Sequence, residues 1–220
     1  MYASTLISYS VPPLKRSDTG VKALLWMNDF HVRHLPVVED GKLLGILSED
    51  EVLNFVDPDQ TIQESASVLL EKYVPANKHL YDIMRLIVNY NLTVIPVLNE
   101  EGEYIGLITV DDLIKKLAAT GSITHPGGVL VLSMAPRDYS LSEISRLIEA
   151  ENTTILSSFI SSPYGNNQLE LTLKLNKEDL KHVVATLERF GYDVKSSFYE
   201  SEIIDTLQDR YEALMRYLDV

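Results

Sequence analysis

The chain contains no cysteine, so it cannot form a disulfide, a thiolate nucleophile or a cysteine-ligated metal site. This absence fits a reducing compartment, and we expect a cytoplasmic protein. No run approaches the roughly eighteen consecutive apolar residues of a membrane-spanning helix. Residues 1–14 also lack a basic segment followed by a long apolar one, which a secretory signal requires. We therefore expect no membrane partner and no secretory leader.

Positive charge is scarce. The sequence has 19 Lys and Arg against 32 Asp and Glu, which gives a formal net charge of −13 at pH 7. Residues 1–120 carry −7 and residues 121–220 carry −6, so the average conceals no basic tail or patch. Because a nucleic-acid surface needs clustered Lys and Arg, we exclude nucleic acid as the main partner.

Catalytic motifs are missing as well. The sequence has no Gly-x-x-x-x-Gly-Lys phosphate loop, no His-Glu-x-x-His and no Gly-x-Ser-x-Gly. Its five histidines are scattered and pair no base with a nucleophile. His31 and His34 are three residues apart, but no third ligand lies near them in the sequence, so we predict no metal site. We predict that the protein is not an enzyme.

An internal repeat with a period of about 60 residues occupies the first half. Residues 34–38 recur as 94–98, and 43–48 recur as 104–109. The acidic pair at 50–51 recurs at 111–112. Because prolines, glycines, hydroxyls and acids all fall in register, chance does not explain the match.

Each copy predicts the same supersecondary unit. Apolar residues at helical spacing come first, at Val21, Leu24 and Leu25 and again at Ile83, Leu86 and Ile87. A short apolar run with a proline, a turn and a second apolar run predict a pair of strands. A further helix opens at Ser48 or Thr109, and the polar connector 57–72 links the copies.

The start of that last helix has two interpretations. Ser48 and Glu51, like Thr109 and Asp112, form the Ser/Thr-x-x-acid pattern of a capping box. The same residue types could bind a ligand, because a carboxylate accepts hydrogen bonds from two neighbouring ribose hydroxyls. A hydroxyl at a helix start can likewise bind ribose or phosphate. The sequence leaves both roles open.

The strings HLPVVEDGKLLGILSEDEVL and TVIPVLNEEGEYIGLITVDDLI resemble a tandem CBS-domain pair, or Bateman module, over residues 1–119. The resemblance implies two repeats that pack about a pseudo-twofold axis. It also implies clefts that bind AMP, ADP, ATP, S-adenosylmethionine or NADH as regulatory ligands, without a covalent cofactor.

The resemblance also implies site residues. Thr109 and Asp112 meet the ribose pattern fully, whereas Glu51 stands where the family has Asp. Arg33 and His34 occupy the place at which phosphate-binding members carry basic residues; a solvated helix end is the alternative. One asymmetric site could use both groups. The candidate ligand-binding residues are Thr109, Asp112, Thr93, Val94, Pro96, Arg33, His34, Pro36, Ser48 and Glu51.

The second half predicts the order βαββαβ, which is ferredoxin-like. Its strand candidates are 129–134, 154–160, 169–175 and 194–199, and apolar stripes at 141–148 and 180–187 predict two helices. Residues 169–175 alternate strictly, as in a half-buried edge or outer strand, and 163–167 predict a hairpin loop. The fold class is α+β, with a CBS repeat at 1–60, a second at 61–122, a ferredoxin-like domain at 127–200 and a C-terminal amphipathic helix at 201–220.

The position of this domain behind a CBS pair resembles an ACT domain, and the whole chain resembles the CBS–ACT proteins of bacterial acetoin utilisation. ACT domains commonly bind an amino acid beside the first strand–helix loop, often at a glycine. Loop 135–140 has no glycine, so dimerisation is the favoured use here. The stripe from Ile203 to Leu218 is expected to pack on a partner subunit or on its own core, within a homodimer.

Two functions remain. The first is a regulatory protein that senses an adenosyl ligand in its clefts and acts on a protein that the sequence does not identify. The second is a ligand-free dimerisation or adaptor scaffold with degenerate clefts.

Overall fold

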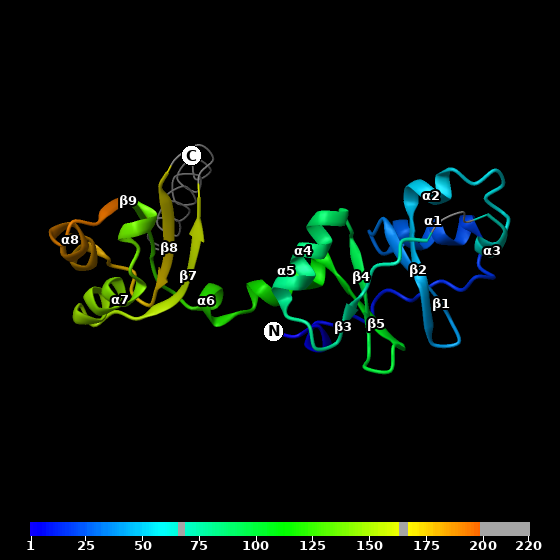
Figure 1. Cartoon of the computed structure of the whole chain (residues 1–220), viewed down its shortest axis with the longest axis horizontal. Coiled ribbons are helices and arrows are strands. Elements are labelled where there is room, and N and C mark those ends of the chain that lie inside the picture. The colour runs from blue at the N-terminus through cyan, green and yellow to red at the C-terminus, as the bar shows by residue number, and fades with distance from the viewer. Residues whose placement is uncertain (66–68, 163–166, 199–220) are drawn as a thin grey trace, which may run out of the picture. The chain divides into compact units, whose positions relative to one another are not determined.

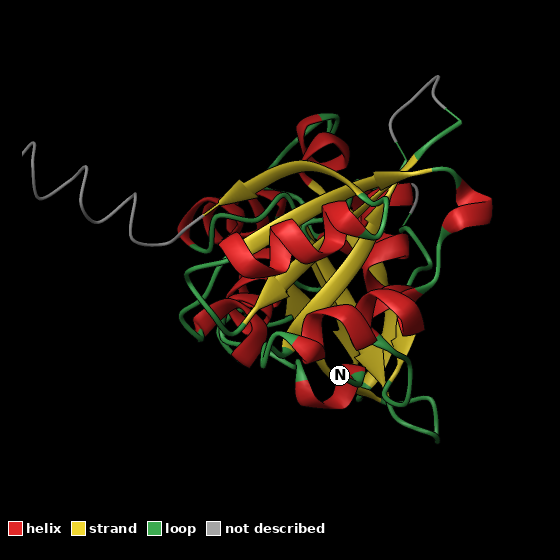
Figure 2. Ribbon diagram, turned by 90° about the vertical axis from the view of Figure 1, so that its left-hand side faces the viewer, coloured by secondary structure: helices red, strands yellow, loops and turns green. Residues whose placement is uncertain are grey.

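The computed structural model describes residues 1–65, 69–162 and 167–198. The chain divides into two compact units, Met1–Leu117 and Ala118–Val220. Figure 1 labels most of the helices and strands, and Figure 2 shows them by type. Among the described residues, no helix has the length and apolar character needed to cross a membrane.

The two repeats of the first unit fold as the sequence predicts, each as helix, strand, strand, helix. The first contains α1 (Gly20–Asp29), β1 (His34–Glu39), β2 (Lys42–Ser48) and α2 (Glu49–Leu53). The second contains α4 (Leu80–Tyr90), β4 (Val94–Leu98), β5 (Tyr104–Thr109) and α5 (Val110–Ala118). The remaining elements are η1 (Ala3–Thr5), α3 (Ile62–Ser65) and β3 (Val74–Pro75).

The segment that precedes each repeat crosses between the two small sheets. β1 pairs with β2, and β4 pairs with β5, both antiparallel. Ser8 bridges Leu107 of the second repeat, whereas Leu70 bridges Ile46 of the first. These two antiparallel bridges are equivalent under the pseudo-twofold relation. Each sheet is therefore extended by the segment that leads into the other repeat.

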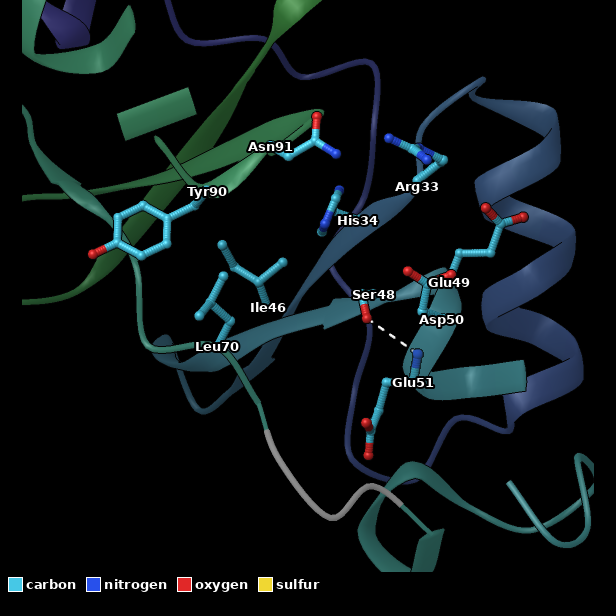
Figure 3. A pocket seen from close by; sticks show the side chains of 10 residues that line it. All are labelled: Arg33, His34, Ile46, Ser48, Glu49, Asp50, Glu51, Leu70, Tyr90 and Asn91. Carbon is cyan, nitrogen blue, oxygen red and sulfur yellow. Dashed lines mark hydrogen bonds between the residues drawn. The ribbon is translucent and has the colours of Figure 1, made fainter. Parts of the chain in front are cut away.

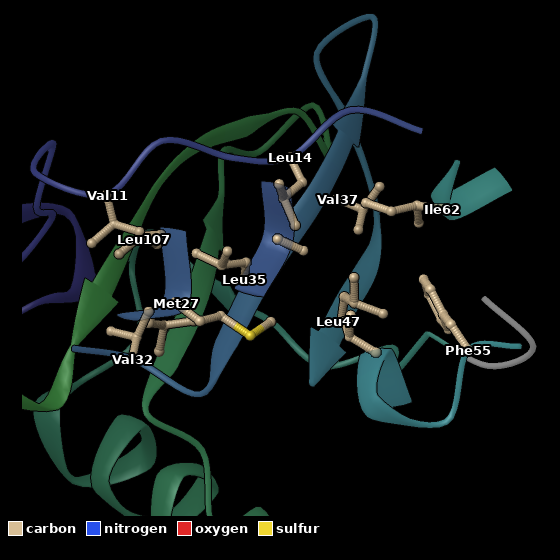
Figure 4. Close-up of a cluster of buried hydrophobic side chains, with 13 residues drawn as sticks. Val11, Leu14, Met27, Val32, Leu35, Val37, Leu47, Phe55, Ile62 and Leu107 are labelled. Atoms are coloured by element: carbon tan, nitrogen blue, oxygen red, sulfur yellow. The ribbon is translucent and has the colours of Figure 1, made fainter. Parts of the chain in front are cut away.

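Two apolar clusters hold the first unit together. One is shown in Figure 4 and combines first-repeat residues such as Leu35 and Leu47 with Val94 and Leu107 of the second repeat. The other centres on Ile83, Ile95 and Ile108 and also takes in Ile46. Because each cluster contains side chains from both copies, the repeats share one interior.

The core-facing stripe of α1 agrees only in part with the expected one. Ala23 and Met27 lie in the core, whereas Val21 is 48% and Leu25 is 56% exposed. Both sets have helical spacing, but the small Ala23 and the flexible Met27 face the sheet. Leu24 packs against the same cluster as expected, whereas Val21 and Leu25 face outward.

The second unit has the predicted βαββαβ order. It contains α6 (Gly121–Thr124), β6 (Val129–Met134), η2 (Pro136–Asp138), α7 (Leu141–Ala150), β7 (Ile155–Ser161), β8 (Leu169–Leu175), α8 (Lys181–Arg189) and β9 (Asp193–Phe198). The strand order β7-β8-β6-β9 is antiparallel throughout, as in a ferredoxin-like sheet. Leucines of β8 and apolar residues of α7 and α8 form its core.

The expectation of an edge or outer strand at 169–175 is wrong. β8 lies between β7 and β6, and its residues alternate between buried and half-buried. Alternation reports that one face of a strand is covered, which holds for an interior strand of an open sheet as well as for an edge. The predicted loop at 163–167 falls largely outside the described residues, and so does the predicted helix at 201–220.

Candidate functional site

Two cavities lie at equivalent places in the first unit, each lined by the start of the last helix of one repeat and by residues of the other repeat. We call them cleft 1, of about 340 Å³, and cleft 2, of about 710 Å³. The lining of cleft 1, shown in Figure 3, is Arg33, His34, Ile46, Ser48, Glu49, Asp50, Glu51, Leu70, Tyr90 and Asn91. The lining of cleft 2 is Ser10, Val11, Asp29, Phe30, His31, Val32, Thr93, Thr109, Val110, Asp111, Asp112, Ile114 and Lys115.

The linings share several equivalent positions. Each cleft has an aromatic residue at the end of a helix of one repeat, and from the other repeat a hydroxyl at the start of its last helix and an acid three residues later. The equivalent pairs are Tyr90 and Phe30, Ser48 and Thr109, Asp50 and Asp111, and Glu51 and Asp112. Arg33 in cleft 1 corresponds to Thr93 in cleft 2. The clefts therefore share a plan and differ in charge placement.

Both hydroxyls cap their helices, as the capping interpretation predicts. The Glu51 N–H donates to Ser48 Oγ at 3.1 Å, which Figure 3 marks with a dashed line. The Asp112 N–H donates to Thr109 Oγ1 at 2.9 Å. In cleft 2, Thr109 also donates its hydroxyl hydrogen to Asp112 Oδ2 at 2.8 Å. Capping and ligand binding are compatible at Asp112. A carboxylate has about four lone-pair sites, so it can accept the Thr109 hydroxyl and further donors from a ligand.

Asp112 is held in its charged form. Its pKa is lowered mainly by a hydrogen bond from the Ser8 side chain; burial opposes this effect, and Thr109 and the nearby Lys115 and Lys116 lower the pKa further. The Asp112 side chain is half-buried, and Thr109 is only 5% exposed. Cleft 2 thus presents an ionised carboxylate beside apolar side chains.

A hydrogen-bonded bridge joins the two clefts. The Arg33 N–H donates to Thr93 Oγ1 at 2.9 Å, and the Thr93 N–H donates to His34 Nδ1 at 3.2 Å. Since Nδ1 accepts a main-chain N–H, the ring is neutral with its hydrogen on Nε2. Burial is the main cause that lowers the pKa of His34; Arg33 lowers it further, and Asp50 opposes them.

The structure separates the candidate residues into three groups. Arg33, His34, Ser48 and Glu51 line cleft 1, whereas Thr93, Thr109 and Asp112 line cleft 2. The basic pair and the ribose-type acid therefore lie in different cavities, although Thr93 bonds directly to the basic pair. Pro36, Val94 and Pro96 are buried within β1 and β4 and contribute to neither lining.

Sequence reasoning missed the residues that end the helices before each first strand. Phe30 and Tyr90 supply the aromatic side of the two clefts. His31 and Asn91 follow them with left-handed backbone, at φ 55° and 49°. The register of the repeat would have identified these positions. Phe30 and Tyr90 each lie three residues before Arg33 or Thr93, and His31 and Asn91 each lie two residues before them. His31 lines cleft 2, whereas His34 lines cleft 1, so these two histidines do not share a cavity.

The second unit has a cavity of about 470 Å³ at the predicted strand–helix loop. Its lining combines that loop, including Arg137 and Tyr139, with residues 190–193 before and within β9. Two residues of the lining are joined directly, because Glu143 accepts a hydrogen bond from the Tyr192 hydroxyl at 3.1 Å.

Comparison with known proteins identifies the repeated half. A family model described as "CBS domain" matches residues 7–58 and 71–119. A magnesium transporter, MgtE of Thermus thermophilus, is 35% identical over 83 residues, which are 38% of this chain and 18% of that protein. The chain thus corresponds to under a fifth of the length of that relative.

Solved structures resemble about half of the chain. A protein of Thermotoga maritima with a CBS-domain pair and an ACT domain gives a TM-score of 0.47 at 19% identity, covering 53% of this chain and 96% of that chain. CBSX2, solved in complex with AMP, gives 0.45 at 18% identity, covering 53% of this chain and 95% of that chain.

Proposed function

Since residues 7–58 and 71–119 form a pair of CBS domains, we propose that the protein is a non-catalytic regulatory protein that binds an adenosyl ligand in cleft 2. The observation that carries the proposal is Asp112, an ionised carboxylate in the first turn of helix α5 that lines a cavity of about 710 Å³. A cavity of this size is within the range of small-molecule sites.

The chemistry of cleft 2 suits a nucleoside. A ribose presents two neighbouring hydroxyl donors, and an ionised carboxylate accepts both in charge-assisted hydrogen bonds. Phe30, Val11 and Ile114 supply apolar and aromatic surface against which a purine base can pack. The polar and apolar parts of the lining thus match the two halves of an adenosine.

One observation favours the ligand-free scaffold instead. Thr109 and Asp112 already satisfy each other in a cap, and Ser48 caps α2 in the same way without a family-type Asp at position 51. If these residues serve only as helix caps, the clefts bind no ligand and the CBS pair acts as a scaffold for protein association. This alternative predicts no adenosine binding in either cleft.

We further propose that the protein is a homodimer. Exposed apolar side chains gather on the outer faces of equivalent helices: Val21 and Leu25 on α1, and Tyr81 and Val88 on α4. Light scattering tests this directly, since the chain mass is 24.8 kDa. A monomer at micromolar concentration contradicts the proposal.

The decisive experiment is calorimetric titration with adenosine, which carries the base and the ribose without a phosphate. Replacing Asp112 by Asn keeps the shape but removes the charge, and hydrogen bonds to a charged group contribute about 1.5–3 kcal/mol. Affinity should fall about ten- to a hundredfold.

The matched control is Glu51→Gln, which makes the same change in cleft 1 and should leave the affinity unaltered. Thermal unfolding of both variants checks that the caps survive. Equal losses in the two variants would place the ligand elsewhere, and no binding by the unmodified protein would favour the scaffold.

A further inference from the structure

The charges of cleft 2 discriminate between adenosyl ligands. Three carboxylates line it, those of Asp29, Asp111 and Asp112, against a single lysine, Lys115. The Lys115 ammonium is already paired with Asp111 four residues earlier on α5. Among the residues that line cleft 2, no Lys or Arg side chain is therefore left to bind an anionic group of a ligand.

Cleft 1 carries a cationic side chain at a position where cleft 2 is neutral. Arg33 lines it and takes part in no ion pair that the structure shows within its described residues. The position equivalent to Arg33 in cleft 2 is Thr93, whose hydroxyl accepts from the Arg33 N–H. A guanidinium that could bind phosphate is thus present in one cleft and replaced by a neutral group in the other.

The start of α5 does not compensate for this loss. A helix N-terminus attracts anions through its unpaired N–H groups and its dipole. Here two carboxylates, Asp111 and Asp112, already occupy the first turn. Thr109 accepts the Asp112 N–H, so that donor is used as well. A phosphate placed there would meet negative charge.

We infer that cleft 2 selects an adenosyl ligand whose 5′ substituent is uncharged or positively charged, such as a sulfonium, over a nucleoside polyphosphate. The inference rests on the proposed function, because it concerns the same site. Like charges a few ångströms apart at a partly exposed site repel by an amount equivalent to about tenfold in affinity per pair. A polyphosphate is repelled by the carboxylates of Asp29 and Asp112, which Lys115 does not pair, whereas a sulfonium is attracted to them.

Two ligand pairs isolate the charge. S-adenosylmethionine and S-adenosylhomocysteine differ by one methyl group and one positive charge, and ATP and adenosine differ by the triphosphate alone. Calorimetric titration without divalent cations should rank S-adenosylmethionine first, then S-adenosylhomocysteine and adenosine, and ATP last. Because salt screens exposed charges, raising the salt concentration from about 0.05 to 0.5 M should reduce the differences in affinity between these ligands.

The variant Asp111→Asn sharpens the test, because it removes one carboxylate and frees the Lys115 ammonium without changing Asp112. The affinity for ATP relative to adenosine should rise about tenfold. Asp50→Asn makes the equivalent change in cleft 1 and should leave that ratio unaltered.

The outcomes separate the two proposals. If adenosine does not bind, the proposed function fails. If adenosine binds and Asp112→Asn weakens it, but ATP binds as tightly as S-adenosylmethionine, the proposed function stands and the charge selectivity is overturned. An ATP-to-adenosine ratio that Asp50→Asn shifts as much as Asp111→Asn also overturns it.

Discussion

The main-chain N–H of Thr93 donates to Nδ1 of His34 at 3.2 Å, and so joins the second repeat to the first. His34 lines cleft 1 and Thr93 lines cleft 2. The contact needs a neutral imidazole, because a protonated Nδ1 donates and cannot accept. This requirement gives the first of four predictions.

The first prediction concerns pH. Burial lowers the pKa of His34 below its ordinary 6.5. The unfolded chain therefore binds the proton more readily, so the stability from the neutral ring is fully present above about pH 6.5. It is lost as the pH falls through the lower folded pKa. His34→Asn keeps an acceptor that does not titrate, so its thermal midpoint should depend less on pH between 7 and 4.5 than that of the unmodified protein.

The exposed His31 supplies the control. His31→Asn also removes one histidine but lies outside the bridge, and it should keep the pH dependence of the unmodified protein. If both variants lose the same amount of pH dependence, the bridge is not the cause.

The second prediction concerns the close approach of the Ile7 side chain to the backbone at Gly106. Gly106 in β5 has φ +145°, and a Cβ there would lie 2.5 Å from Ile7 Cγ2. Gly102 also has positive φ, +81°, but a Cβ would meet nothing within 4 Å. Gly106→Ala should therefore lose about 1–3 kcal/mol more unfolding free energy than Gly102→Ala, as measured by urea denaturation. Equal losses would mean that backbone conformation alone sets the cost.

The third prediction concerns the cap of α5. Thr109→Val removes the acceptor for the Asp112 N–H and should cost about 1 kcal/mol of unfolding free energy. Thr109→Ser retains the hydroxyl and should keep most of that stability. Denaturant titration of both variants measures the difference. A serine variant as unstable as the valine variant would point to lost methyl packing.

The fourth prediction concerns the two units. Leu171 is fully buried in the core of the second unit, and Leu35 in that of the first. Each core consists of residues of one unit only, so each mutation should act on one unfolding transition. Leu171→Ala should cost the second unit about 2–5 kcal/mol, and Leu35→Ala should do the same to the first. Calorimetric scans in which either variant shifts the unfolding of both units to the same extent would contradict this prediction.

The sequence predicts local structure well where side-chain pattern and turn chemistry agree. β6 and β8 begin and end at the residues that the patterns predict, 129–134 and 169–175. The register of the repeats likewise predicts the equivalent caps at Ser48 and Thr109. These features depend on neighbours in the chain, which the sequence displays directly.

The order of the strands and the membership of the clefts depend on distant segments instead. Alternation shows that one face of β8 is covered but not which strands flank it, and pairing places it inside the sheet. The segments before each repeat cross to the opposite sheet, and each cleft is lined from both repeats. Arg33 therefore lines one cleft and Asp112 the other. The sequence determines which residues are equivalent; the packing of the two copies decides which of them share a cavity, because contacts between the repeats join residues about sixty positions apart.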